Sequence, residues 1–172
     1  MKLNNPLKLI ISIIAVQLAG IIGSVFTTSS IQTWYAGIVK PSFNPPNWVF
    51  GPVWTTLFLL MGIAAFLVWR QLDSPVFSRG NDKEKDLGNR QIKIALSIFI
   101  GQLVLNTFWS IIFFGLCSPG GAFVEIIFLW LAILATIISF AKISKPAAWL
   151  LAPYILWVTF AAYLNYFIWM LN

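Results

Sequence analysis

The sequence predicts an all-α membrane protein in which five transmembrane helices form a bundle and a single domain, residues 1–172. Hydrophobic residues make up 59% of the chain and charged residues only 9%. Typical soluble domains carry about 25% charged residues, so lipid must surround most of this surface. Five stretches reach the roughly 20 apolar residues that a bilayer-spanning helix needs. Lys and Arg also gather on alternate connections, as they do around transmembrane helices.

The first apolar stretch covers residues 7–26. Lys2 and Lys8 precede or begin it, as in a signal peptide. The stretch is nevertheless longer than a typical signal-peptide core, and no clear small-x-small cleavage site follows. We therefore interpret it as a transmembrane helix. Residues 27–47 follow and contain Pro41, Pro45 and Pro46, which a helix interior excludes, so they predict a long first loop.

The remaining stretches cover residues 48–69, 94–116, 122–141 and 147–171. Between the first two of these, residues 71–91 are polar and charged, which predicts a solvated flexible linker. Short turns at 118–121 and 144–146 join the last three stretches. Helices joined by such short turns become antiparallel neighbours.

Ten of the eleven Lys and Arg residues fall on one side of this topology, and Lys40 alone falls on the other. The ten are Lys2, Lys8, Arg70, Arg79, Lys83, Lys85, Arg90, Lys93, Lys142 and Lys145. By the positive-inside rule, the N-terminus is cytoplasmic and the C-terminus lies outside. A bacterial-type inner membrane fits this bias best, with an organelle membrane as the alternative. Because the bias explains the net charge of +6, no nucleic-acid partner is expected.

Three predicted helices carry polar or aromatic stripes at helical spacing. The stripes are Trp54, Phe58 and Met61; Gln102, Asn106, Trp109 and Ser110; and Trp157, Ala161 and Asn165. One interpretation is packing, with amide hydrogen bonds across helices that contribute about 0.6–2 kcal/mol each. The other is a pocket for a flat, apolar ligand that stacks on aromatic faces. Glu125, near the start of the fourth stretch, is expected to extend to the headgroups.

Metal and cofactor chemistry lack their usual side chains in this sequence. There is no His and only one Cys, which removes the commonest metal ligand and any multi-thiolate site. The chain also offers no acid–base pair or nucleophile motif. We therefore expect no metal and no resident cofactor.

A long motif at 34–55 reads WYAGIVKPSFNPPNWVFGPVWT. Further motifs are GQLVLN at 101–106 and PYILWVTFAAYLN at 153–165. Together they resemble the translocator protein family, whose members are also called tryptophan-rich sensory proteins or peripheral-type benzodiazepine receptors. The resemblance covers nearly the whole chain except residues 71–91.

This resemblance implies a five-helix bundle, commonly a homodimer, with loop 27–47 as a lid over a pocket. The pocket would bind porphyrins and isoquinoline-carboxamide or benzodiazepine-type ligands. Matching positions place Trp34, Tyr35, Trp54, Phe58, Asn106, Trp109, Trp157 and Ala161 in it. We add Gln102 from the amide stripe as a donor to polar ligand edges.

Three functions stay open at this stage. The first is a receptor or transporter-like protein in tetrapyrrole or stress sensing. The second is an enzyme that breaks down porphyrins with light and oxygen, using Trp54 and Trp157. The third is a scaffold whose pocket holds only membrane lipid.

Some positions depart from the family pattern. Phe43 stands where Trp is usual, and Phe58 stands where Tyr is common, which removes a hydroxyl from the pocket. No Lys or Arg follows Tyr166, so we expect no cholesterol site of the C-terminal motif type.

Overall fold

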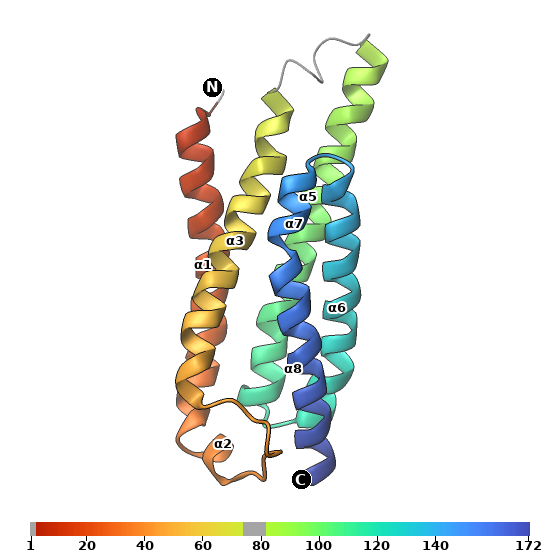
Figure 1. Ribbon diagram of the computed structural model, residues 1–172. Helices are drawn as coiled ribbons and strands as arrows, with labels where there is room; N and C mark the ends of the chain where they lie inside the picture. The colour runs from red at the N-terminus through yellow and green to blue at the C-terminus, as the bar shows by residue number, and fades with distance from the viewer. Residues whose placement is uncertain (1–2, 74–81) are drawn as a thin grey trace.

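The computed structural model describes residues 3–73 and 82–172, and they form long helices that run side by side (Figure 1). Lys2, Arg79 and positions 74–81 of the expected linker lie outside the described residues. The elements are α1 (Asn5–Ile31), α2 (Trp34–Gly37), α3 (Asn47–Trp69), the 3₁₀ turn η1 (Arg70–Asp73), α5 (Asp82–Ser110), the π-helical turn η2 (Ile111–Gly115), α6 (Pro119–Ala141), α7 (Lys145–Leu150) and α8 (Ala152–Leu171).

Among the described residues, five helical segments are long and apolar enough to cross a membrane. They are α1, α3 with η1, α5 with η2, α6, and α7 with α8. This finding confirms the fold class. The N-terminus and the α6–α7 turn lie at one end of the bundle, and α2 and the C-terminus lie at the other (Figure 1). We call these the N-terminal end and the lid end. The cytoplasmic placement of the N-terminus stays a prediction.

Helix α1 extends beyond the expected residue 26 to Ile31. The threonine hydroxyls of its polar C-terminal turn are satisfied within the helix. The Thr27 hydroxyl donates to the Gly23 carbonyl at 3.2 Å, and the Thr28 hydroxyl donates to the Ser24 carbonyl at 2.8 Å. The first loop is correspondingly shorter and contains α2.

Helix α5 begins at Asp82, inside the segment expected to be a flexible linker. Lys, Glu and Arg are good helix formers, so the helix continues from the membrane into this charged segment. The last membrane-length segment has a break instead. Pro153 has no backbone N–H, and the chain there passes through Leu151 between α7 and α8.

The N-terminal half of the bundle is densely packed. Helix α3 packs against α1 and α7, while α6 packs against α5, α7 and α8. A Cβ atom on Gly62 would lie only 2.8 Å from Cα of Ile13, so α1 and α3 approach backbone to backbone. Met61, Ala64 and Val68 of α3 have no exposed surface. Glycine is required at position 62 for this close contact.

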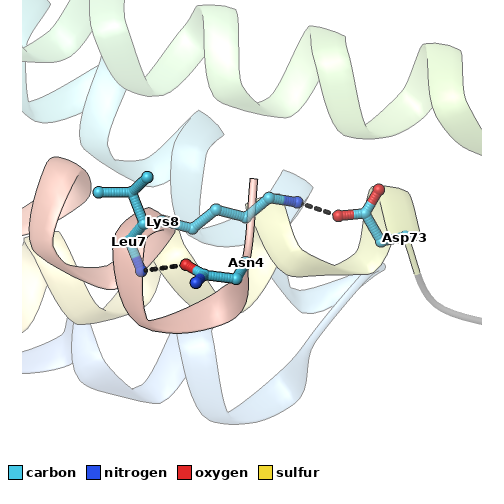
Figure 2. Close-up of polar contacts among 4 residues, drawn as sticks. All are labelled: Asn4, Leu7, Lys8 and Asp73. Atoms are coloured by element: carbon cyan, nitrogen blue, oxygen red, sulfur yellow. Dashed lines mark hydrogen bonds and ion pairs between the residues drawn. The ribbon is translucent and has the colours of Figure 1, made fainter. Parts of the chain in front are cut away.

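An ion pair joins the N-terminal end of α1 to η1, the turn that follows α3 (Figure 2). The Lys8 ammonium donates to the Asp73 carboxylate and lies 5.5 Å from the ring centre of Trp69. Asn4 caps α1 by accepting a hydrogen bond from the Leu7 backbone N–H at 3.0 Å. Because the Lys8 side chain is only 5% exposed, the Asp73 carboxylate supplies the acceptor that water would otherwise provide.

Candidate ligand cavity

A cavity of about 490 Å³ occupies the lid half of the bundle. Small-molecule sites typically measure about 300–1,000 Å³. Its walls come from α1, α2, α3, α5, η2 and α8, and they include Gly20, Tyr35, Trp54, Phe58, Asn106, Trp109, Phe113, Phe114, Ala161 and Asn165. Most of these side chains are apolar or aromatic. The cavity therefore has the size and lining of a site for an apolar, ring-containing molecule.

Stacked aromatic pairs form two of the walls. Trp54 stacks on Phe58 with ring centres 5.5 Å apart, and Trp109 stacks on Phe113 at 5.0 Å. A Cβ atom on Gly20 would lie 2.3 Å from Cε2 of Phe58, so glycine makes room for this ring against α1. Contacts within the protein therefore fix the positions of these wall side chains before a ligand binds.

Amide hydrogen bonds cross from α5 to α8 beside the cavity. The Asn106 Nδ2 donates to the Tyr154 hydroxyl at 3.1 Å, and that hydroxyl donates to Gln102 Oε1 at 2.9 Å. The Trp109 indole donates to Asn165 Oδ1 at 3.1 Å. Packing amides and a cavity thus occur together, and the two interpretations of the stripes do not exclude each other.

Six of the nine expected site residues line the cavity: Tyr35, Trp54, Phe58, Asn106, Trp109 and Ala161. The other three are not among the residues that line it. Trp157 packs against Phe50 at 6.0 Å, and Trp34 packs against Phe113 at 5.5 Å, so each supports a lining ring. Gln102 is 1% exposed and bonds to the Tyr154 hydroxyl.

Two buried donors near these residues lack a hydrogen-bond partner within the described part of the chain. They are Gln102 Nε2 and Trp157 Nε1. Both oxygens of the Glu125 carboxylate are also buried without a partner there. Glu125 therefore does not extend to the headgroups, because its carboxylate lies inside the helix bundle. The sequence alone does not separate these orientations, since both place the residue on the same helix.

The contribution of α1 is the part of the site that sequence reasoning missed. Gly20, Gly23, Ser24, Thr27 and Thr28 all line the cavity. Small residues are typical of close helix packing, but here they create space. The turn η2 was missed too, and there the adjacent rings of Phe113 and Phe114 both reach the cavity. Widened π-helical turns are frequent at functional sites.

The segment from α2 to the start of α3 lies at the lid end of the cavity, where Tyr35 and Asn47 line the wall. The Tyr35 hydroxyl donates to Asn44 Oδ1 at 3.0 Å, and the Lys40 ammonium lies 4.7 Å from the Tyr35 ring centre. Burial raises the pKa of the Tyr35 phenol above its ordinary value, while the hydrogen bond to Asn44 lowers it in part. The phenol is therefore neutral at physiological pH and acts as a hydrogen-bond donor.

Residues of the lid also contact the C-terminal part of the chain, at α8 and at Asn172. Phe43 stacks on Tyr163 with ring centres 5.3 Å apart. The Val39 backbone N–H donates to Asn172 Oδ1 at 2.9 Å, and Asn172 Nδ2 donates to the Val39 carbonyl at 3.0 Å. A single amide side chain thus pairs with both backbone groups of one lid residue.

Comparison with known proteins gives consistent matches along the chain. The TspO/MBR family model matches residues 12–170. The chain is 45% identical to the "Tryptophan-rich protein TspO" of Archaeoglobus fulgidus over 168 residues, which covers 98% of this chain and 99% of that protein. It is 39% identical to the "Translocator protein" of Homo sapiens, over 91% and 85% of the two chains. It is 34% identical to the "Tryptophan-rich sensory protein" of Cereibacter sphaeroides, over 84% and 82%.

Proposed function

The chain belongs to the TspO/MBR family of integral, multi-pass membrane proteins, and on that premise we propose that it is a receptor for flat, ring-containing ligands. Its ligands would be porphyrins and isoquinoline-carboxamide or benzodiazepine-type compounds, and its role would be tetrapyrrole or stress sensing. The observation that carries the proposal is the 490 Å³ cavity with stacked aromatic walls.

The shape of the walls suits planar ligands. Aromatic rings gain about 0.5–1.5 kcal/mol from offset or edge contacts beyond the area that they bury. A ligand between Trp54 and Trp109 would contact indoles whose neighbours, Phe58 and Phe113, already fix their orientation. Pre-ordered side chains lose less entropy on binding. A tetrapyrrole is larger than a drug-sized molecule, so it would fill the cavity and extend into its opening.

A titration in the dark tests the proposal. Purified protein is titrated with protoporphyrin IX, and the bound ligand is then competed with an isoquinoline carboxamide. We expect saturable, competitive binding, and Trp54→Phe should weaken it by about three- to tenfold because one stacking face is lost. Trp149→Phe is the control, because Trp149 is 76% exposed on α7 and away from the cavity. Absence of saturable binding to the wild type would refute the receptor.

The two other functions are outcomes of the same experiment. An enzyme that degrades porphyrin with light and oxygen would give a new product absorbance on illumination, and Trp54→Phe and Trp157→Phe, alone and combined, would suppress it. Phe50 lines the cavity and Trp157, which packs on it, does not; this favours the receptor, since a ligand in the cavity would touch Phe50 rather than Trp157. A lipid-filled scaffold would show neither competition nor product.

A further inference from the structure

The cavity reaches the outer surface of the bundle between α1 and α3. Several residues that line it are exposed on these helices. Ile21 is 57% exposed and Trp48 is 75% exposed, and Ser24, Gly51 and Thr55 are also exposed. Residues that line a cavity and also face outward mark an opening. Because α1 and α3 both have the length and hydropathy of membrane spans, this opening faces lipid.

Helix contacts limit the opening at both of its ends. Towards the N-terminal end, α1 and α3 meet backbone to backbone at Ile13 and Gly62. The Gln17 side chain also crosses the gap there, and its Nε2 donates to the Thr55 carbonyl at 3.4 Å. Towards the lid end, Asn47 and the Tyr35 side chain contribute to the cavity wall. The gap is therefore a bounded window in the side of the bundle.

The rim of this window is compatible with a lipid environment. The Ser24 hydroxyl donates to the Ile21 carbonyl at 2.7 Å, and the Thr55 hydroxyl donates to the Gly51 carbonyl at 2.9 Å. Thr28 likewise donates within its own helix. Hydroxyls that are satisfied in this way do not present unpaired donors to hydrocarbon, where each would be costly. An apolar molecule can pass them without breaking hydrogen bonds of the protein.

From these observations we propose that the gap framed by Ser24, Thr28, Gly51 and Thr55 is a lateral portal. Apolar or amphipathic ring compounds dissolved in the bilayer pass through it between the membrane and the cavity. The proposal rests on the receptor function, because it assigns the route and the membrane-dissolved class of its ligands. The lid is the alternative route, and two hydrogen bonds between Asn172 and Val39 attach it to the end of α8.

Gly51 allows the portal to be blocked without distorting the fold. A Cβ atom on Gly51 would meet nothing within 4 Å, so Gly51→Phe places a ring in the gap without a clash at Cβ. Gly101 is the matched control. It is also helical and exposed, a Cβ atom there also meets nothing within 4 Å, and it does not line the cavity.

The test measures association and dissociation rates of protoporphyrin IX in phosphatidylcholine nanodiscs. A blocked portal raises one barrier for both directions, so Gly51→Phe should slow both rates by about tenfold or more. Gly101→Phe should keep wild-type rates. Association should also follow the concentration of ligand in the lipid rather than in the water.

A second pair of variants approaches the gap from α1. Thr28→Phe should also slow both rates, whereas Val25→Phe should not, because Val25 is 64% exposed but does not line the cavity. Wild-type rates in both Gly51→Phe and Thr28→Phe would overturn the portal while leaving the receptor intact. A change confined to dissociation and Kd would overturn it too, because it would indicate an altered binding contact. Failure of the wild type to bind would instead refute the receptor.

Discussion

The N-terminal half and the lid half of the bundle use glycine on the α1–α3 interface in opposite ways. At Gly62 the missing side chain lets the backbone of Ile13 approach, so the two helices close on each other. At Gly20 the space is taken by the ring of Phe58, which stacks on Trp54 and forms a cavity wall. The same residue type therefore gives tight packing where backbone fills the space and supports a cavity where an aromatic ring does.

Polar groups differ between the halves as well. At the N-terminal end, the charged Lys8 and Asp73 pair with each other at the edge of the bundle. Beside the cavity, the hydrogen bonds join neutral groups, such as Asn106 to Tyr154 and Trp109 to Asn165. Neutral amides are less costly to bury than charges. The cavity wall can thus contain polar groups, and a ligand does not need a charged group to bind beside them.

The largest effect should follow from filling the tight contact. Gly62→Leu would place Cβ 2.8 Å from the Cα of Ile13, and a backbone atom cannot rotate away. We expect the free energy of unfolding to fall by about 3 kcal/mol or more. The measurement is unfolding in mixed micelles. Gly101→Leu, at an open helical position, is the control, and equal stability of the two variants would contradict the close approach of α1 and α3.

A smaller loss is expected from the ion pair in Figure 2. Asp73→Asn leaves the Lys8 ammonium, whose side chain is 5% exposed, without its carboxylate. The loss should be about 1–3 kcal/mol, because Asp73 is itself partly exposed and solvent screens part of the interaction. Lys8→Met replaces the charge with an apolar chain and should cost less. If Asp73→Asn and Lys8→Met lower the free energy of unfolding equally, the buried charge of Lys8 does not govern the effect.

Hydropathy and charge patterning were sufficient to predict the five spans, because both follow from the physics of the bilayer. They did not locate the helix ends. A polar segment that looks like loop continues α1 to Ile31, and the hydroxyls of Thr27 and Thr28 there bond to carbonyls one turn back. Helix α5 likewise extends beyond the apolar stretch to Asp82. A hydropathy threshold marks where lipid ends, whereas backbone hydrogen bonds decide where a helix ends.

The cavity was predicted only in part, because a sequence pattern shows which residues share a helix face and not what surrounds them. Helical spacing places Trp54 and Phe58, or Asn106 and Trp109, on one face, and these residues do share the cavity. Helical spacing does not show how far a side chain lies from a cavity, however, so it does not reveal that Trp157 packs on Phe50 without lining the cavity or that Gln102 bonds to Tyr154. The role of α1 was equally hidden, since Gly20 and Ser24 contribute space rather than chemical groups.

The smallest effect on stability is expected at the lid. Asn172→Ala removes both hydrogen bonds to the Val39 backbone. Because these groups are exposed to solvent, the free energy of unfolding should fall by less than about 1 kcal/mol. Amide hydrogen exchange at Val39 should nevertheless become faster, because the local attachment of the lid is lost. Asn172→Asp should have a smaller effect on exchange, since it keeps an oxygen that accepts from the Val39 N–H and loses only the donor to the Val39 carbonyl.

The same variant separates the two routes to the cavity. If ligands pass between α1 and α3, a loosened lid leaves the association rate of protoporphyrin IX unchanged even while exchange at Val39 accelerates. If the lid is the route, Asn172→Ala speeds association and Gly51→Phe does not slow it. Measuring both variants in one nanodisc preparation therefore assigns the rate-limiting barrier to one region of the lid half, since each change alters only one of the two openings.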